Sequence, residues 1–243
     1  MICPACNHNN HPNARFCSHC GGELSAPVYV ATRDMGSITK TVVFFVVMVV
    51  FIVSLYFIDI NSNYANIILA NIVFSLIVLV FFAMDFRDTL NVLKFKDPEP
   101  MLMTALATGA PVFALGVFFF VDYLNKNIFD IYIISEYYLF IDSPAPLLLA
   151  LISTAVFPAI FEEIAFRGVL FNMLEPFAGK TPTIFITAIM FSTIHFSLIS
   201  LLWLFPIGLL FGYLRARHNT LWYGIIGHFL YNSSVVLYGV LLA

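Results

Sequence analysis

The stretch PAIFEEIAFRG, residues 158–168, places two adjacent glutamates and an arginine inside a long apolar run that opens near Ala145. The apolar pattern continues for two more helical turns after Gly168. A helix needs about 20 apolar residues to cross a bilayer, and an ionisable side chain at that depth is costly. We therefore interpret residues 145–165 as a membrane span whose charged cluster has a function.

The whole chain has the composition of a membrane protein. Of its 243 residues, 61% are hydrophobic and 10% are charged, whereas a soluble domain carries about 25% charged residues. The formal net charge of −3 does not indicate nucleic-acid binding. We predict an all-α polytopic membrane protein with about seven transmembrane helices, and we expect residues 122–144 to form an external loop or interfacial segment. The candidate spans are residues 41–58, 64–84, 101–121, 145–165, 182–199, 200–214 and 221–242.

Basic residues flank the predicted spans unevenly. The loops on one side carry Arg15, Arg33, Lys40, Arg87, Lys94, Lys96, Arg167, Lys180, Arg215 and Arg217. The loops on the other side carry Lys126 alone. Because the cytoplasmic loops of membrane proteins are enriched in Lys and Arg, we expect an integral cell membrane protein with its N-terminus in the cytoplasm and Ala243 outside.

Helix geometry separates the two glutamates. Glu163 and Arg167 are four residues apart, so they project on one side of a helix and can form an ion pair. Glu162 is offset from Arg167 by about 140° and points elsewhere. Pro158 removes a backbone hydrogen bond and can kink the helix or admit water. We expect the ion pair to brace the helix and Glu162 to face a cavity as the catalytic base.

Two later spans carry polar groups with the same spacing. His195 follows Phe191 by four residues, and Asn232 follows His228 by four. A single histidine on an apolar helix is more often a packing residue than a catalyst. Three successive polar clusters inside spans are harder to explain by packing. Imidazole and carboxamide supply the proton carrier and the donors that a hydrolytic site needs beside a carboxylate.

These three clusters resemble the motifs of the CPBP family, which covers CAAX proteases and bacteriocin-processing or self-immunity proteins. The matching elements are Glu162-Glu163-x-x-x-Arg167, Phe191-x-x-x-His195 and His228-x-x-x-Asn232, which occur in the family's order. The resemblance covers residues 145–240, so the first three spans lie outside it.

The resemblance to the type II prenyl endopeptidases of this family implies an intramembrane peptidase. By that resemblance, Glu162, helped by His195, activates a water molecule. His228 and Asn232 bind the oxyanion of the tetrahedral intermediate, and the ion pair predicted above supports the site. The expected substrate is a peptide or protein, prenylated or not, at the lipid bilayer.

Other functions remain open at this point. One Glu and two His could hold a catalytic zinc with water as the fourth ligand, although we expect a metal-free, glutamate-dependent mechanism. The fold could instead serve as a non-catalytic scaffold or bacteriocin-immunity protein. A proton-coupled transporter is a further alternative, but the spans show no internal repeat of the kind common in transporters.

All four cysteines lie near the N-terminus, in CPACNHNNHPNARFCSHC at residues 3–20. Cys3 and Cys6 form one C-x-x-C pair, and after ten residues Cys17 and Cys20 form a second. Two such pairs complete a structural Zn²⁺ site with no open position for chemistry. Disulfide pairing is the alternative, but a cytoplasmic segment stays reduced. The stretch also resembles the short zinc ribbons at the N-termini of many prokaryotic membrane proteins.

The residues around the cysteines refine this prediction. His8, His11 and His19 could serve as ligands, but four cysteines leave them no vacancy, so we expect surface histidines. With Arg15 as the one basic residue among the first 22, the ribbon is predicted to bind a protein partner rather than nucleic acid.

The predicted organisation has four parts. They are a zinc ribbon (1–24), a linker (25–40), N-terminal transmembrane helices (41–121) and a CPBP-like peptidase core (145–243). Within the core, Gly208 and Gly212 have the spacing of a close helix-packing face. The spacing leaves open whether that contact lies within one chain or between two.

Overall fold

The computed structural model describes residues 2–3, 5–11, 14, 16–22, 24, 35–58, 63–95, 98–130 and 135–242. The chain divides into two compact units, Met1–Met35 and Gly36–Ala243. Most of the predicted linker, residues 25–34, lies outside the described residues. Its last six residues differ from the prediction, because helix α1 already begins at Met35.

The second unit is built from helices. The longer ones are α1 (Met35–Phe57), α2 (Tyr64–Met84), α4 (Pro100–Leu124), α8 (Lys180–Thr193), α9 (Leu201–His218) and α10 (Trp222–Leu241). Short helical segments are α3 (Phe86–Leu93), η2 (Asn125–Phe129) and η3 (Glu136–Phe140). One continuous helical run consists of α5 (Pro146–Leu151), η4 (Ile152–Val156), α6 (Phe157–Glu163), η5 (Ile164–Leu170) and α7 (Phe171–Ala178).

Among the described residues, five helical stretches are long and apolar enough to cross a membrane. They are Gly36–Phe57, Tyr64–Met84, Pro100–Phe129, Pro146–Ala178 and Trp222–Leu241. This confirms the prediction of an all-α polytopic membrane protein. The helix after Glu163 runs on to Ala178, so the charged cluster lies well inside the fourth stretch.

The third stretch corrects one prediction. Residues 122–129 were expected in a loop or interfacial segment, but they continue α4 and its following π-turn. The continuation is stabilised by an ion pair of Lys126 Nζ with Asp122 Oδ1 at 2.9 Å, one helical turn apart.

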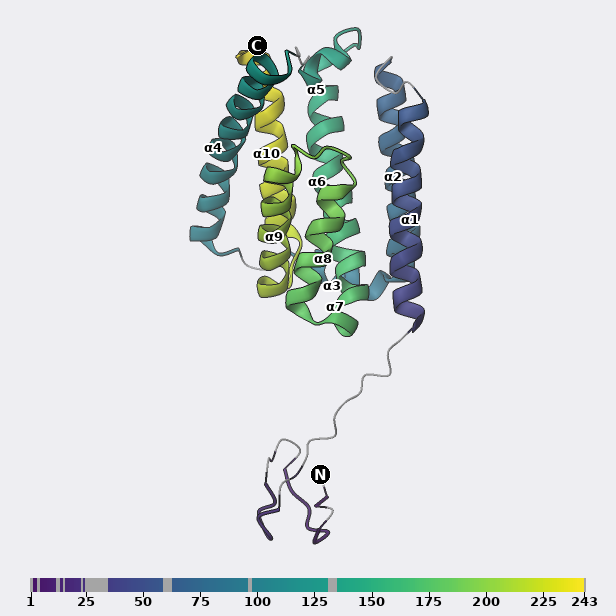
Figure 1. Ribbon diagram of the computed structural model, residues 1–243, viewed down its shortest axis with the longest axis vertical. Coiled ribbons are helices and arrows are strands. Elements are labelled where there is room, and N and C mark those ends of the chain that lie inside the picture. The colour runs from purple at the N-terminus through teal and green to yellow at the C-terminus, as the bar shows by residue number, and fades with distance from the viewer. Residues whose placement is uncertain are drawn as a thin grey trace. The chain divides into compact units, whose positions relative to one another are not determined.

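The predicted fifth and sixth spans form a shorter helical hairpin. At 1.5 Å per residue, α8 is about 21 Å long and α9 about 27 Å, compared with a hydrocarbon core of about 30 Å. Figure 1 shows the turn between them beside α6, short of the bundle end where α10 terminates. A hairpin returns to the side of the membrane from which it entered. Replacing two of the seven predicted crossings by this hairpin therefore leaves each chain end on the side where the prediction placed it relative to the other.

The predicted glycine face forms the contact between the two helices of this hairpin, α9 and α8, in one chain. A Cβ on Gly208 would lie 3.0 Å from the Cα and Cβ of Ala188, and one on Gly212 would lie 3.1 Å from Cγ2 of Ile184. Both neighbours belong to α8. The two glycines therefore let α9 approach α8 closely.

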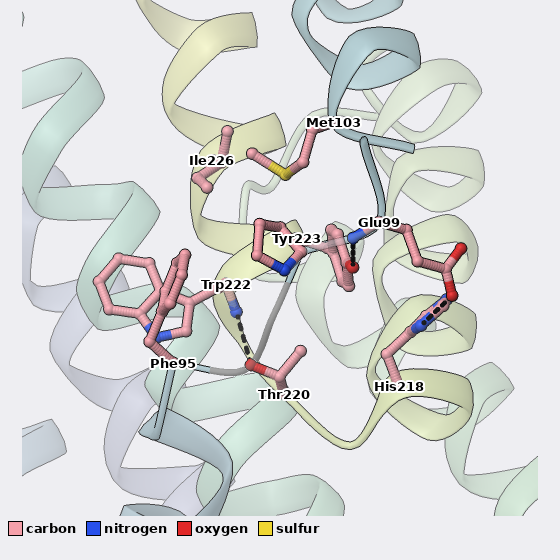
Figure 2. Close-up of a pocket in the computed structure, with 9 residues that line it drawn as sticks. Phe95, Glu99, Met103, His218, Thr220, Trp222, Tyr223 and Ile226 are labelled. Atoms are coloured by element: carbon pink, nitrogen blue, oxygen red, sulfur yellow. Dashed lines mark hydrogen bonds and ion pairs between the residues drawn. The ribbon is translucent and has the colours of Figure 1, made fainter. Parts of the chain in front are cut away.

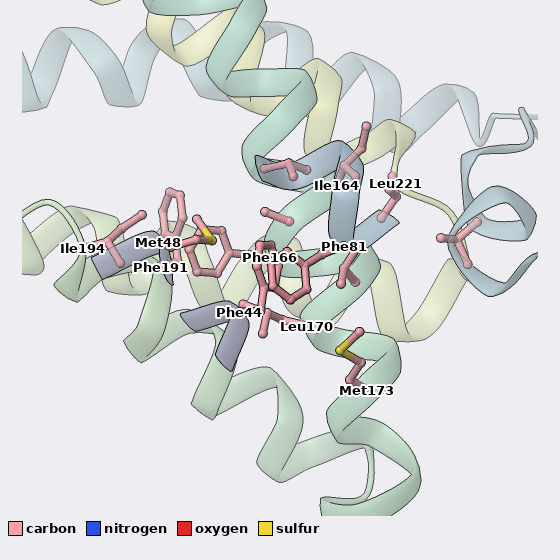
Figure 3. Close-up of a cluster of buried hydrophobic side chains, with 14 of the residues drawn as sticks. Phe44, Met48, Phe81, Ile164, Phe166, Leu170, Met173, Phe191, Ile194 and Leu221 are labelled. Carbon is pink, nitrogen blue, oxygen red and sulfur yellow. The ribbon is translucent and has the colours of Figure 1, made fainter. Parts of the chain in front are cut away.

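The main apolar core surrounds the π-helical segment η5. Figure 3 shows Phe44 and Met48 of α1, together with Phe81 of α2, near Phe166 and Leu170 of η5. In the apolar window of α10, 44% of the residues are buried, compared with 17% in the window of α1. The run 146–178 and α10 are therefore the central helices, and the outer helices present most of their apolar side chains to lipid.

The basic residues of this unit gather at one end of the bundle. Arg87 lies in α3, Lys180 begins α8, and Arg215 and Arg217 lie in the last turn of α9. In Figure 1 these segments lie at the end where α1 begins, and the C-terminal end of α10 lies at the opposite end. Lys126 lies in η2, which follows the C-terminal end of α4.

Candidate active site

The two glutamates of the charged cluster lie between two π-helical segments, and Arg167 lies in the second of them. The segment η4 ends where the N–H of Phe157 bonds the carbonyl of Ile152, five residues back. Pro158 then occupies the first turn of α6, inside the continuous helical run, so its missing N–H removes the donor of a carbonyl one turn earlier. Glu162 and Glu163 end α6, and η5 follows directly. Single π-turns inside α-helices are often found at functional sites.

The predicted ion pair between Glu163 and Arg167 is confirmed. Nη1 of Arg167 donates to Oε1 of Glu163 at 3.0 Å, and both side chains are fully buried. The guanidinium lies 4.4 Å from the ring centroid of Phe191, and its Nη2 donates to the carbonyl of Gly208 at 3.4 Å. Removing either charge would therefore leave its partner in an apolar environment.

Glu162 faces a cavity, as its helical offset predicted. The cavity of about 240 Å³ lies among α1, α2, α6 and the end of α8. Its lining residues are Phe51, Ile52, Leu55, Ala70, Asn71, Phe74, Phe157, Pro158, Glu162, Ile194 and His195. The Glu162 side chain keeps 16% of its surface exposed, whereas that of Glu163 keeps none. Two adjacent acids thus have different surroundings.

His195 shares this cavity with Glu162 but does not lie within a helix. The prediction placed it inside a span, whereas α8 ends at Thr193 and His195 lies in the following turn. Its Nδ1 is 2.9 Å from the carbonyl oxygen of Phe191. Because a carbonyl only accepts, Nδ1 must be the donor, so in the neutral ring Nε2 is an acceptor.

His228 lies between the two glutamates. Its Nδ1 is 3.3 Å from Oε1 of Glu163, and its Nε2 is 3.9 Å from Oε2 of Glu162. The first distance allows a hydrogen bond to the carboxylate, but the second is too long for one. One turn earlier, a Cβ on Gly224 would collide with Oε2 of Glu163. Glycine at that position lets α10 approach the acid closely enough for this contact.

Asn232 lies one turn after His228 and binds a different group. Its Nδ2 donates to the backbone carbonyl of Thr154 in η4 at 2.9 Å. The structure thus brings Glu162, Glu163 and His228 into one cluster with Arg167, and it connects His195 to this cluster through the cavity. The hydrogen bond of Asn232 is with the helix that carries the acids, rather than with the acids themselves.

A second polar network, which the sequence reasoning did not identify, adjoins this cluster. Nε of Arg215 donates to the carbonyl of Arg167 at 3.0 Å, and Nη2 donates to Oδ1 of Asn172 at 2.8 Å. Asn172 in turn donates to Oδ2 of Asp85 at 2.8 Å, and so does Thr89 at 2.6 Å. The sequence interpretation counted Arg215 as a flanking charge that orients the protein. Arg215 is in fact buried. The one hint of this network in the sequence is the spacing of Asp85 and Thr89, which are four residues apart and so can hydrogen-bond on one face of a helix.

Another cavity, of about 160 Å³, lies where α4, α9 and α10 meet (Figure 2). Oε1 of Glu99 is 3.5 Å from Nδ1 of His218, and the backbone N–H of Glu99 donates to the hydroxyl of Tyr223 at 2.9 Å. Phe95 and Trp222 add aromatic rings to its wall. None of the predicted site residues lines this cavity, so it is separate from the candidate active site.

In the first unit the four cysteine sulfurs gather within 4.8 Å of one another. Cys3 and Cys20 are 3.6 Å apart, as are Cys6 and Cys17. Each C-x-x-C pair is followed directly by a residue with positive φ, Asn7 at 55° and Gly21 at 70°.

The thiols of this cluster differ in acidity. The N–H groups of Cys20 and His19, together with the Asn10 side chain, lower the pKa of Cys17 to about 5. At Cys6 the backbone N–H of His8 lowers the pKa, but the neighbouring thiols and burial outweigh it and raise that pKa to about 12. In the part of the chain that the structure describes, the cysteines are the one group of three or more His, Cys, Asp or Glu residues arranged to hold a metal ion.

Residues 144–234 match the family described as Type II CAAX prenyl endopeptidase Rce1-like. No curated protein and no solved structure matches the chain. The matched range contains all three motifs on which the resemblance was recognised, and it begins within one residue of the predicted core. The resemblance to this protease family is therefore confirmed for the C-terminal part of an integral membrane protein.

Proposed function

We propose that the core of residues 145–243 hydrolyses a peptide bond at the membrane, with Glu162 as the general base. The observation that carries this proposal is the different environment of the two acids. Glu163 is buried against Arg167 and His228, whereas Glu162 and His195 line one cavity. A base must reach its substrate, and Glu162 is the acid that can.

In the proposed reaction, the Glu162 carboxylate removes a proton from a water molecule while the water oxygen attacks the peptide carbonyl carbon. The new C–O bond moves the carbonyl π electrons onto the oxygen, which becomes an oxyanion. The C–N bond then breaks, and the amine leaves with the proton that Glu162 had taken. Glu162 returns to its carboxylate form. His195, with Nε2 as acceptor, is suited to orient the water beside Glu162.

His228 and Asn232 are proposed to stabilise the oxyanion. The carboxylate of Glu163 accepts from Nδ1 of His228 and so orients the ring, as the carboxylate does in other hydrolytic triads. Nε2 of His228 lies 3.9 Å from Oε2 of Glu162, on the side of the reacting atoms. Since Nδ1 already carries a proton, Nε2 donates to the oxyanion when the ring carries both protons, a form that the Glu163 carboxylate stabilises. One N–H of the Asn232 amide bonds Thr154, and its second N–H is the donor proposed for the oxyanion.

The proposed substrate is a membrane-associated peptide. The wall of the cavity is mostly apolar and is built from α1 and α2 as well as from the matched core. Such a wall suits an apolar or lipidated segment beside the scissile bond. A non-catalytic scaffold of the same fold is the second candidate function, and a catalytic zinc held by glutamate and histidine is the alternative mechanism.

The cysteine cluster is proposed to hold one structural Zn²⁺. Four thiols within 4.8 Å, of which Cys17 is thiolate at neutral pH, supply the donor set that tetrahedral zinc prefers. Such a site contributes folding energy to a unit too small for a sufficient apolar core. A protein partner for this unit remains a prediction.

The basic residues at one end of the bundle support a cytoplasmic N-terminus. Cysteine labelling from outside intact cells should therefore reach a probe near Asp130 and miss one near Lys94. The opposite pattern would reverse the proposed orientation.

The proposed activity is tested with the full chain in lipid nanodiscs. The probes are a fluorogenic peptide ending in a farnesylated CAAX sequence and the same peptide without the lipid. Glu162→Gln should lower the cleavage rate about 10²- to 10⁴-fold, because the amide cannot accept the proton. Glu136→Gln, the same exchange outside the spans, is the matched control.

Each result of this test separates the candidate functions. Cleavage by the native chain that survives a strong chelator supports the glutamate mechanism, and its loss favours a catalytic zinc. Equal cleavage by the native and Glu162→Gln chains would refute the role of Glu162. If neither peptide is cleaved while the chain still binds them, the scaffold function is favoured.

A further inference from the structure

The two π-helical segments that flank α6 each leave backbone carbonyls without the donor, four residues further on, that a regular α-helix supplies. Side chains from other helices bind these carbonyls. We infer that Asn71 and Arg215 are positioning residues, because they replace missing helical hydrogen bonds at the two ends of α6 and thereby hold Glu162 and Glu163 in place. This inference rests on the proposed function and adds two residues to its site, one of them outside the matched family range.

At the first end, the missing donor is that of Pro158. A residue at this position would offer its N–H to the carbonyl of Thr154 in an α-helix, or of Ser153 in a π-helix. Proline has no N–H, so it serves neither carbonyl. Nδ2 of Asn71 donates to Ser153 at 3.0 Å, and Nδ2 of Asn232 donates to Thr154 at 2.9 Å. Two amides from α2 and α10 thus bind the carbonyls that the proline leaves without its donor.

At the second end, the hydrogen bonds of η5 pass over the carbonyl of Arg167. The N–H of Phe171 bonds the carbonyls of Phe166 and Gly168. In a regular α-helix it would bond the carbonyl of Arg167, four residues back. That carbonyl instead accepts from Nε of Arg215 at 3.0 Å. Arg215 therefore binds the backbone of the same residue whose side chain holds Glu163.

Arg215 is itself held firmly. Its Nη1 donates to Oδ1 of Asn219 and its Nη2 to Oδ1 of Asn172, each at 2.8 Å. Its guanidinium also lies 5.1 Å from the ring centroid of Phe171. Asn172 is fixed in turn by Asp85 at 2.8 Å. A buried side chain with all of these contacts has little freedom to move, so it can define the position of the backbone that it binds.

The segment between these two attachments is short. Helix α6 has seven residues, or about 10 Å at 1.5 Å per residue. Glu162 and Glu163 lie at its C-terminal end, next to η5. A misplacement of about 1 Å at a reacting group can lower a rate about 100-fold. Loss of either attachment should therefore lower kcat, and it should affect KM little, because the substrate still finds the same cavity.

The first test is a double-mutant cycle on Asn71 and Pro158, measured with the farnesylated fluorogenic peptide. Asn71→Ala should lower kcat about 10-fold and leave KM within about 2-fold. In a Pro158→Ala background, residue 158 has an N–H that can serve the η4 carbonyls. The same Asn71→Ala change should then cost less than about 2-fold in kcat. Asn127→Ala is the matched control, because its Nδ2 also bonds a helix carbonyl, that of Tyr123, at 2.9 Å on an exposed surface.

The cycle separates positioning from direct contact. Asn71 also lines the cavity, so it could act on the substrate itself. An equal loss in both backgrounds, or a rise in KM without a change in kcat, would overturn the inference for Asn71.

The second test compares two arginines in the last turn of α9. Arg215→Lys keeps the charge but loses the planar fork of donors, so kcat should fall about 10-fold with KM nearly unchanged. Arg217→Lys, at an exposed position two residues later, should leave both constants unchanged. Equal kinetics of the two variants would overturn the positioning role of Arg215.

A measurement without catalysis keeps the inference testable if the native chain cleaves neither peptide. Amide hydrogen exchange of residues 159–171 should become faster in Asn71→Ala and in Arg215→Lys, and remain unchanged in Asn127→Ala and Arg217→Lys. Faster exchange with no cleavage by the native chain would support the attachments and refute the proposed activity. Unchanged exchange in all four variants would refute the attachments, whatever the activity.

Discussion

The cysteine cluster and the charged cluster both gather reactive side chains, but they depend on different forces. The four thiols come from 18 consecutive residues, and their apolar surroundings are few: Leu24 and Ala14 pack beside Cys3 and Cys17. The acids and histidines come from α6, α10 and the turn after α8, and the main apolar core of the membrane unit surrounds their helix. The first cluster should therefore depend on its metal, and the second on helix packing.

The largest expected effect on folding comes from breaking the buried ion pair of the charged cluster. Glu163→Gln leaves Arg167 buried without its counter-charge, which should cost about 3–5 kcal/mol of stability. Thermal unfolding in detergent should show this loss together with a loss of cleavage. The double variant Glu163→Gln with Arg167→Met should recover part of the stability without full activity.

The adjacent acid is the internal control for that prediction. Glu162→Gln should unfold near the native temperature, because its side chain is partly exposed in the cavity and lies outside the ion pair. If Glu162→Gln is the unstable variant and Glu163→Gln the folded, inactive one, the assignment of the two acids is reversed.

A smaller effect is expected from closing the gap between α10 and Glu163. Gly224→Ala adds a Cβ that collides with the Glu163 carboxylate, and such overpacking costs about 1–3 kcal/mol. Gly116→Ala in α4 is the matched control, since nothing lies within 4 Å of its new Cβ. Gly224→Ala should unfold at a lower temperature than Gly116→Ala. Equal stability would mean that α10 can move away from the acid, which would contradict the close packing of Gly224 against Glu163.

The smallest effect on the membrane unit should come from the cysteine cluster. The full chain should carry about one zinc, and Cys17→Ser should lose it without changing cleavage or the unfolding of the membrane unit. His19→Ala should keep the metal. Because protons compete with the metal for the four thiolates, the zinc content should fall between neutral and acidic pH. The pKa of Cys17, lowered to about 5, favours retention of the metal at neutral pH.

Metal analysis of the purified chains, across that pH range, checks this prediction. A stoichiometric zinc that stays bound in a chain lacking residues 1–30 would place a metal in the membrane unit. That result would also contradict the metal-free mechanism proposed here.

Local patterns in the sequence were sufficient for several features of both clusters. Apolar runs of span length predicted the membrane helices, because the bilayer leaves a helix few other ways to satisfy its backbone. The spacing of Glu163 and Arg167 predicted their ion pair, since residues four apart meet on a helix. The two C-x-x-C pairs predicted the thiol cluster in the same way. Each of these features depends on residues close together in the chain.

The tertiary structure decided the features that depend on distant residues. It ended α8 before His195, paired Asn232 with Thr154, and showed that the glycine face of α9 packs against α8 of the same chain. It also turned Arg215 from a predicted surface charge into a buried donor to the backbone of Arg167. The periodicity of apolar residues along the chain does not determine which helices become neighbours. Where a buried polar group finds its partner is therefore settled only when the helices pack and every carbonyl released by a proline or a π-turn must find a donor.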